Sequence, residues 1–172
     1  MDAQSYEDLI LAALLHDIDD HKYFQTIDYC NAKDVLNGAG LNPTRVSKIV
    51  SMIGLVSFSK NGNDISPDVP LSYYLPRYID RTEAIGLQGL YRSLLYSIEK
   101  QSGVAVYRED TPRPESKEQM MMMSEGRDAA YMQRGGRSVS VVDHIFDKLV
   151  HIKLPSEISN RFLMDLYEQK QV

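Results

Sequence analysis

Apolar residues recur at helical spacing in most segments of this chain, and no stretch of any length alternates apolar and polar residues as a strand would. Side chains three and four positions apart share one face of a helix, so such segments can bury a common stripe. The clearest example follows Pro43, where Val46, Ile49, Val50 and Ile53 form one apolar face. The sequence therefore predicts an all-α fold.

Capping residues divide this helical pattern into six expected helices. Asn42 is a good N-cap, and Pro43 suits the first position of the helix that would follow. Ser5 and Asp8 together resemble a capping box ahead of an apolar run. The expected helices cover residues from about 6 to 15, 26 to 37, 43 onward, 73 to 100, 139 to 152 and 155 to 169, and residues 57–68 are expected to form a loop.

The length of 172 residues fits a single domain covering 1–172. Residues 101–137 differ in character, because they contain a Pro-rich stretch, a methionine run at 120–123 and a glycine pair between two arginines. We expect this segment to be a long excursion before the last two helices, with one helical stretch around the methionines. Segments of this length inside a compact domain are usually functional or disordered.

Charge and cysteine content restrict the class of partner. The net charge of −5 argues against a general nucleic-acid or anionic-membrane surface and leaves room for a local basic pocket.

The single cysteine, Cys30, cannot form an intrachain disulfide, which suits a reducing compartment. No basic and apolar leader is recognisable, and the apolar run 9–15 is far shorter than the roughly 20 residues that span a bilayer. A cytoplasmic protein is expected, with a nuclear location as the alternative.

An abrupt polar cluster, residues 16–21 (His-Asp-Ile-Asp-Asp-His), follows the apolar run. The imidazole of His16 and the carboxylate of Asp17 are both ligands for divalent ions. The side chains of neighbouring residues on a helix point about 100° apart. One ion bound by both His16 and Asp17 would therefore lie beyond the end of the helix. Alternatively, Asp17 would bridge two ions while His16 binds one of them. Asp80 is a candidate further ligand, because it lies in an apolar-patterned helix where an unpaired buried carboxylate is costly. Alternatively, His16 and Asp17 end a solvated helix, and Asp80 pairs with a neighbouring arginine.

Four segments, in chain order, resemble the motifs of the HD superfamily of metal-dependent phosphohydrolases. Residues 11–24 resemble the helix with the His-Asp motif, and residues 57–60 (Ser-Phe-Ser-Lys) resemble a loop that follows it. Residues 79–86 (Ile-Asp-Arg-Thr-Glu-Ala-Ile-Gly) are similar to the second acidic motif, and residues 138–149 are similar to a late helix. The nearest resemblance is to small bacterial-type HD hydrolases related to nucleotide pyrophosphohydrolases.

The resemblance implies an HD-domain helical bundle and a divalent metal ion (manganese, magnesium, iron or zinc) held by His16, Asp17 and Asp80. It also implies hydrolysis of a phosphate ester or anhydride bond, with a nucleotide as the small phosphorylated substrate. Asp17 would in addition orient the attacking water. Lys60, Arg81 or an arginine from the 101–137 segment would stabilise the developing negative charge.

Three acidic or imidazole side chains near these ligands have two interpretations each. Glu83 shares a helix face with Asp80 and would transfer a proton or support a ligand, or it is simply exposed. Asp20 and His21 would hold His16 in its tautomer, or they belong to a solvated helix end. The sequence leaves both interpretations open.

The HD pattern begins with a further histidine on a preceding helix, and this sequence has no counterpart upstream of residue 16. The alternative function is therefore a catalytically degenerate HD module that binds a ligand or a protein partner. A plain helical interaction protein, in which the 101–137 segment binds the partner, is a third hypothesis. Homo-oligomerisation is compatible with each of them.

Overall fold

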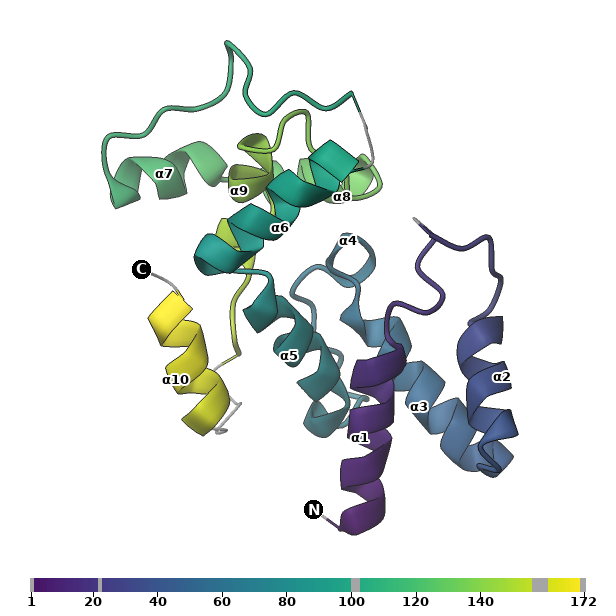
Figure 1. Ribbon diagram of the computed structural model, residues 1–172. Coiled ribbons are helices and arrows are strands. Elements are labelled where there is room, and N and C mark those ends of the chain that lie inside the picture. Colours follow the sequence, from purple (N-terminus) through teal and green to yellow (C-terminus); the bar gives the residue numbers. More distant parts are fainter. Residues whose placement is uncertain (1, 22, 100–102, 156–160, 171–172) are drawn as a thin grey trace. The chain divides into compact units, whose positions relative to one another are not determined.

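The computed structural model describes residues 2–21, 23–99, 103–155 and 161–170 (Figure 1). In these residues the regular structure is helical, and the one β-type pairing is an isolated parallel bridge between Ala105 and Ser140. The prediction of an all-α fold is therefore confirmed. None of the described helices combines the length and the apolar character needed to span a bilayer.

The contacts of the chain divide it into two compact units. The first unit comprises Met1–Ser57 and Ile65–Asp80, and the second comprises Phe58–Asp64 and Arg81–Val172. Each unit has its own apolar core. The expectation of one HD-type domain over residues 1–172 stays a prediction, because two compact units can belong to one domain or to two.

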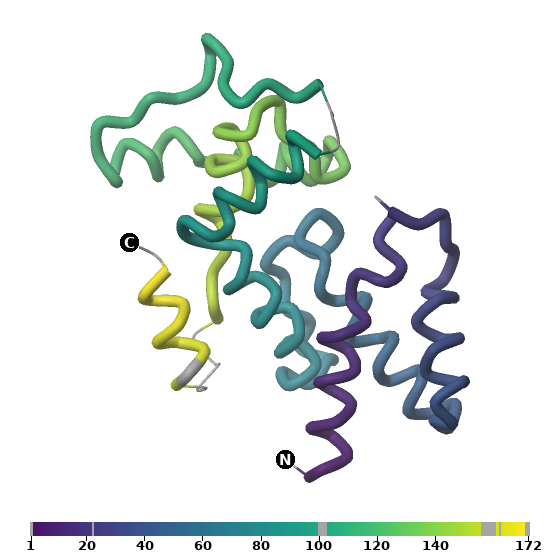
Figure 2. Tube along the Cα trace, viewed as in Figure 1, coloured from purple at the N-terminus to yellow at the C-terminus, as the bar shows by residue number. Residues whose placement is uncertain are grey.

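The first unit is built on α3 (Pro43–Val56), which packs against α1 (Ala3–Leu15) and α2 (Cys30–Gly38). Figure 2 shows these three segments running beside one another. The short 3-10 turn η1 (Leu71–Tyr74) also packs on α3 and leads into α5 (Leu75–Glu83). The core of this unit consists of Leu9, Ala12, Ala32, Leu36, Val46, Ile49, Met52 and Ile53.

The first residues of α3 are capped as the sequence predicted, whereas those of α1 are capped by a different residue. The Asn42 side chain accepts a hydrogen bond from the Arg45 N–H at 3.0 Å, so the predicted cap of α3 is confirmed. At α1, Asp2 is the cap in place of the expected Ser5, and its carboxylate accepts from both the backbone N–H and the hydroxyl of Ser5. The helix therefore begins at Ala3, earlier than expected.

One acid of α1 is completely buried, although it lies directly before the apolar run 9–15 and was expected only to cap the helix. Asp8 is 0% exposed, and its Oδ1 accepts hydrogen bonds from Arg45 Nε at 2.9 Å and Nη2 at 2.7 Å. Its Oδ2 accepts from Lys48 Nζ at 2.9 Å. These bonds raise the pKa values of Arg45 and Lys48. Because Leu14 is 74% exposed, α1 buries one face only, and this face includes an ion-paired acid.

The helix α2 begins later than residue 26, the start that the sequence indicated. Asp28 and Tyr29 both have a φ of 55°, in the left-handed region, which prevents the helix from extending further back. Asp19 caps the helix from a distance: its carboxylate accepts from the backbone N–H groups of Asn31 at 3.1 Å and Ala32 at 2.8 Å. This arrangement satisfies two of the free N–H groups in the first turn of α2.

The expected long helix at 73–100 is divided in the structure into η1, α5 and α6 (Gly86–Glu99). Gly86 has a φ of +70°, and a Cβ there would lie 3.0 Å from the Lys170 carbonyl oxygen. A side chain at this position would meet strain and close contact together. The helical apolar pattern continues across this point, which is why the break was missed.

The second unit contains the short helix α4 (Phe58–Asn61), which corrects the expected loop at 57–68. Its other elements are α6, α7 (Lys117–Ser124), α8 (Arg127–Gln133), α9 (Asp143–Asp147), η2 (Leu149–His151) and α10 (Arg161–Lys170). The expected helix at 139–152 is present only as α9 and η2, and residues 156–160 of the expected last helix lie outside the described residues. The buried core consists of Phe58, Ile85, Tyr131, Leu149 and Ile152.

The described part of the 101–137 segment is held by polar contacts and is more ordered than the expected excursion. Arg127, on the unforeseen helix α8, pairs through Nε with Asp147 at 2.7 Å and through Nη2 with Asp143. Asp143 also accepts from Thr111 Oγ1 at 3.0 Å and Ser140 Oγ at 2.6 Å. Burial acts to raise the pKa of Asp143, but these hydrogen bonds outweigh it and the pKa is lowered.

Candidate metal centre

His16 is the C-cap residue of α1, and a backbone contact fixes the direction of its ring. Its Nδ1 lies 2.7 Å from the carbonyl oxygen of Ala13, one turn earlier, which can only accept, so Nδ1 is the donor. The Nε2 atom therefore faces away from the helix backbone. Histidines that bind metals commonly donate their other ring N–H to a carbonyl or carboxylate in this way.

Two carboxylates converge on this Nε2 atom. Asp17 Oδ2 lies 3.2 Å from it and Asp80 Oδ1 lies 3.4 Å from it. The His16 side chain is 22% exposed, compared with 62% for Asp17 and 30% for Asp80. The structure thus brings together residues 16, 17 and 80 within the first unit, and we refer to them as the imidazole–carboxylate cluster.

Asp80 reaches the cluster because α5 is anchored in the first unit by the residues that precede it. Tyr74, Arg77 and Tyr78 are each 1% exposed. Arg77 donates from Nε to the Leu55 carbonyl at 2.7 Å, and its guanidinium lies 4.6 Å from the centre of the Tyr74 ring. These contacts fix the rotation of α5 about its axis, and therefore the direction of Asp80.

The two carboxylates strongly favour the protonated ring. The hydrogen bond with Asp17, followed by that with Asp80, raises the pKa of His16 from 6.5 to about 10. Since the pKa is higher in the folded than in the unfolded state, this contribution to stability is complete below pH 6.5 and disappears as the pH rises through 10.

We expect His16→Gln to lower the free energy of unfolding most just below pH 6.5, and to have little effect once the pH exceeds 10. The reason is that the charged ring stabilises the fold only while it keeps its proton. Urea unfolding of both proteins across this range measures the difference. A difference that stays constant with pH would show that the two carboxylates do not hold the proton.

The donors of this cluster suit a divalent cation, although they do not form a ready metal site as placed. Two donor atoms bound to one ion at about 2.1 Å lie roughly 3.0 to 3.4 Å apart, which is close to the separations around Nε2. Among the described residues, however, no group of three or more His, Cys, Asp or Glu side chains is arranged to hold a metal ion. Both carboxylates face Nε2 itself, so a cation would replace its proton and the side chains would re-orient.

The two neighbours expected to support His16 contact each other. Asp20 Oδ1 lies 3.4 Å from His21 Nδ1, and the His21 side chain is 66% exposed. The carbonyl of Asp20 accepts from the backbone N–H groups of Tyr23 and Phe24, which forms the turn after the cluster. Their support of His16 stays a prediction.

The remaining predicted catalytic residues belong to the second unit. Lys60 is exposed at the end of α4, and Glu83 is 48% exposed and pairs with Lys170 at 3.3 Å. Arg81 is 2% exposed and donates from Nη2 to the Gly62 carbonyl at 2.6 Å, with Phe58 beneath its guanidinium. These contacts give Arg81 a structural part in the second unit, and the three catalytic roles stay predictions.

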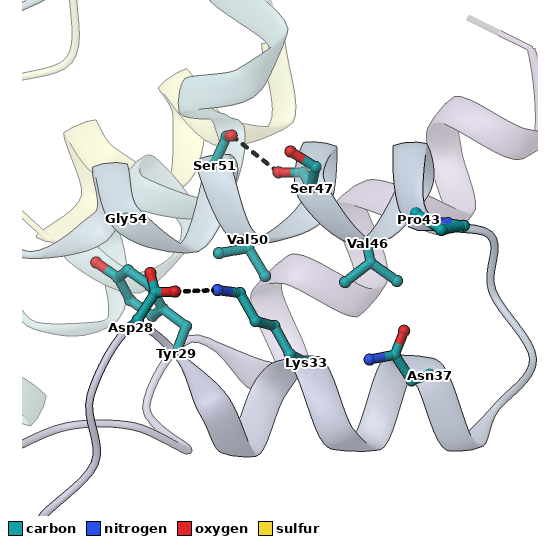
Figure 3. Close-up of a pocket in the computed structure, with 10 residues that line it drawn as sticks. All are labelled: Asp28, Tyr29, Lys33, Asn37, Pro43, Val46, Ser47, Val50, Ser51 and Gly54. Carbon is teal, nitrogen blue, oxygen red and sulfur yellow. Dashed lines mark hydrogen bonds and ion pairs between the residues drawn. The ribbon is translucent and has the colours of Figure 1, made fainter.

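A groove of about 540 Å³ lies between α2 and α3 in the first unit. Figure 3 shows Val46 and Val50 facing the space beside α2, with the ion pair of Lys33 and Asp28 at one end. Tyr29 covers the helix at Gly54, where an added Cβ would lie 3.3 Å from the Tyr29 hydroxyl. The three cluster residues do not line this groove.

The fold and the cluster together define an all-α protein with one imidazole and two carboxylates gathered from α1, the turn after it, and α5. The chain is 34% identical, over 172 aligned positions, to "Uncharacterized protein L803" of Acanthamoeba polyphaga mimivirus, and the alignment spans 90% of this chain and 68% of the relative. The chain therefore belongs to the same protein family as this viral protein. No family model and no solved structure matches it.

Proposed function

We propose that this protein is a metal-dependent hydrolase of phosphate ester or anhydride bonds, of the HD superfamily type, with a nucleotide as its substrate. The observation that carries the proposal is the convergence of Asp17 and Asp80 on His16 Nε2, at 3.2 and 3.4 Å. Asp80 is 64 positions away from His16 in the sequence, so the contact between the two side chains depends on how α5 packs in the fold. The order of the HD-like motifs in the sequence supports the same assignment.

The residues of the cluster have distinct parts in this proposal. A divalent cation supplies a water of lowered pKa, near 7, and neutralises charge on phosphoryl oxygens. His16 is held by the Ala13 carbonyl, so that Nε2 stays directed at the ligand position. Asp17, the most exposed of the three, is placed to accept a hydrogen bond from water as well as to bind the ion. Asp80 adds the second negative charge.

The test is turnover by the full chain after chelation and reloading with manganese, magnesium, iron or zinc, on a panel of nucleoside mono-, di- and triphosphates. We expect release of phosphate, pyrophosphate or nucleoside with at least one ion. Asp80→Asn should lower the rate at least about 100-fold, because even an indirect partner of a metal ligand contributes about 10- to 100-fold.

The matched control is Asp34→Asn, which removes an exposed acid from α2 of the same unit and should leave the rate unchanged. Circular dichroism of each variant shows whether the fold is kept. No turnover by the folded wild-type chain with any of these ions and nucleotides would contradict the proposal.

One observation favours a second candidate, a catalytically degenerate HD module that binds a ligand or a partner. Among the described residues, no group of three or more His, Cys, Asp or Glu side chains is arranged to hold a metal ion. This candidate predicts that a nucleotide binds, as measured by calorimetry, and is recovered unchanged. Turnover that depends on Asp80 would exclude it.

A further inference from the structure

Two aromatic side chains, Tyr23 and Phe24, follow the imidazole–carboxylate cluster in the chain. Their ring centres lie 6.5 Å apart, and the planes of the rings are inclined by 60°. Tyr23 is 51% exposed and Phe24 is 44% exposed, so the first unit, to which both belong, buries neither ring. Aromatic rings that stay accessible beside a few polar groups are typical of the surfaces that bind small ligands.

Backbone hydrogen bonds hold this aromatic pair close to the cluster. The N–H of Asp20 donates to the carbonyl of Asp17 at 3.0 Å. The Asp20 carbonyl in turn accepts from the N–H groups of Tyr23 at 2.9 Å and Phe24 at 3.0 Å. A bond between positions three apart closes a turn whose ends lie within about 7 Å of each other, and two such turns connect Asp17 to the aromatic pair. The Asp19 carboxylate, which caps the first turn of α2, anchors the same loop.

The charges around the aromatic pair restrict the class of ligand. Residues 17–28 contain four aspartates and one lysine. This excess of negative charge would repel an anionic membrane surface or a nucleic-acid strand. A single nucleotide is compatible with it, because a divalent cation at the cluster would neutralise the charge of its phosphates. The uncharged base would then be free to contact the aromatic rings, and every base has a face that stacks on aromatic side chains.

We infer that Tyr23 and Phe24 form the base-binding surface of the nucleotide site, on which the base of the substrate stacks while its phosphates bind at the cluster. This inference rests on the proposed function, and it adds the residues that distinguish a nucleotide from other phosphate esters. Stacking of one base on an aromatic side chain increases affinity by about 10-fold or more. Because stacking tolerates every base, the two rings select a class of substrate and not one particular nucleotide.

The test compares the binding of two ligands that differ in the base alone, AMP and ribose 5-phosphate. Calorimetry of the full chain with manganese gives both dissociation constants, and chromatography of the recovered ligand shows whether it was hydrolysed. We expect the wild-type chain to bind AMP at least about 10-fold more tightly than ribose 5-phosphate. The double substitution Tyr23→Leu, Phe24→Leu should reduce this ratio to about one, because leucine keeps the apolar bulk but has no ring on which a base can stack.

Tyr6→Leu is the matched control, since Tyr6 is a 63% exposed aromatic residue at the opposite end of α1 from His16. It should leave the ratio unchanged, as should the exchange of the two rings in Tyr23→Phe, Phe24→Tyr. Circular dichroism shows whether each variant keeps its helices. A preference for AMP that is lost with the two rings upholds this inference even where no nucleotide is hydrolysed, so the two proposals are tested separately. A wild-type chain that does not prefer AMP, or an equal loss in Tyr6→Leu, would overturn the inference.

Discussion

Replacing Arg127 with alanine is expected to lower the free energy of unfolding by about 3 kcal/mol. The guanidinium of Arg127 pairs with Asp143 and Asp147, whose side chains are only 4% and 1% exposed. Removing the cation would leave buried carboxylates with fewer partners, and the desolvation penalty of such groups is large. Urea unfolding followed by circular dichroism measures the change.

The comparison for Arg127 is Arg108→Ala, which removes a cation paired with the exposed Asp110 at 3.0 Å. An exposed pair of this kind contributes little to stability, since water screens both partners. Equal effects of the two substitutions would show that the Arg127 network does not hold the second unit together.

The first unit has its own buried charge, and Asp8→Ala is expected to destabilise the protein by about 3 kcal/mol. Asp8 is fully buried and holds Arg45 and Lys48 of α3 against α1. Its loss removes three hydrogen bonds and leaves two cations partly buried, at 19% and 28% side-chain exposure. Thermal and urea unfolding report the loss.

Glu7→Ala is the control for Asp8, because Glu7 binds the same Arg45 Nη2 atom at 2.8 Å but is 60% exposed. It should lower stability by less than about 1 kcal/mol. Should Glu7→Ala prove as damaging as Asp8→Ala, burial would not be the reason that Asp8 matters.

Local chemistry was sufficient to predict some elements from the sequence and insufficient for others. The Asn42-Pro43 start of α3 was predicted because capping depends on residues within one turn. The break at Gly86 was missed, since the positive φ there accompanies a close approach of Lys170, which is 84 positions away. The start of α2 depends on Asp19, which is 12 positions before Asn31, and no local signal reveals it.

The buried ion pairs were missed for a similar reason. Asp8 and Arg45 are 37 positions apart, and Arg127 and Asp147 are 20 apart. In the sequence each of these residues resembles an ordinary surface charge, and only the packed structure shows which charges lose their contact with water. The pairing of Arg127 with α9 also explains why part of the expected excursion is ordered.

The proximity of the three residues of the imidazole–carboxylate cluster could be predicted from the sequence better than the buried ion pairs could. Residue types and the HD-like motifs predicted that Asp80 lies near His16 and Asp17. In the structure, a carboxylate oxygen of Asp17 and one of Asp80 lie within 3.4 Å of His16 Nε2. The orientation of that ring was not predicted, because it depends on a hydrogen bond to a backbone carbonyl. The unit to which Lys60 and Glu83 belong was not predictable either, since motif order carries no information about contacts.

We propose that His16, Asp17 and Asp80 together bind one divalent cation. Isothermal titration of the full chain with manganese, in two buffers of different ionisation enthalpy, measures both stoichiometry and proton release. We expect one ion per chain and release of a proton from His16, and we expect His16→Gln to abolish binding while Asp34→Asn retains it. Binding that persists unchanged in His16→Gln, or no binding by the wild-type chain, would show that these three residues do not form a metal site.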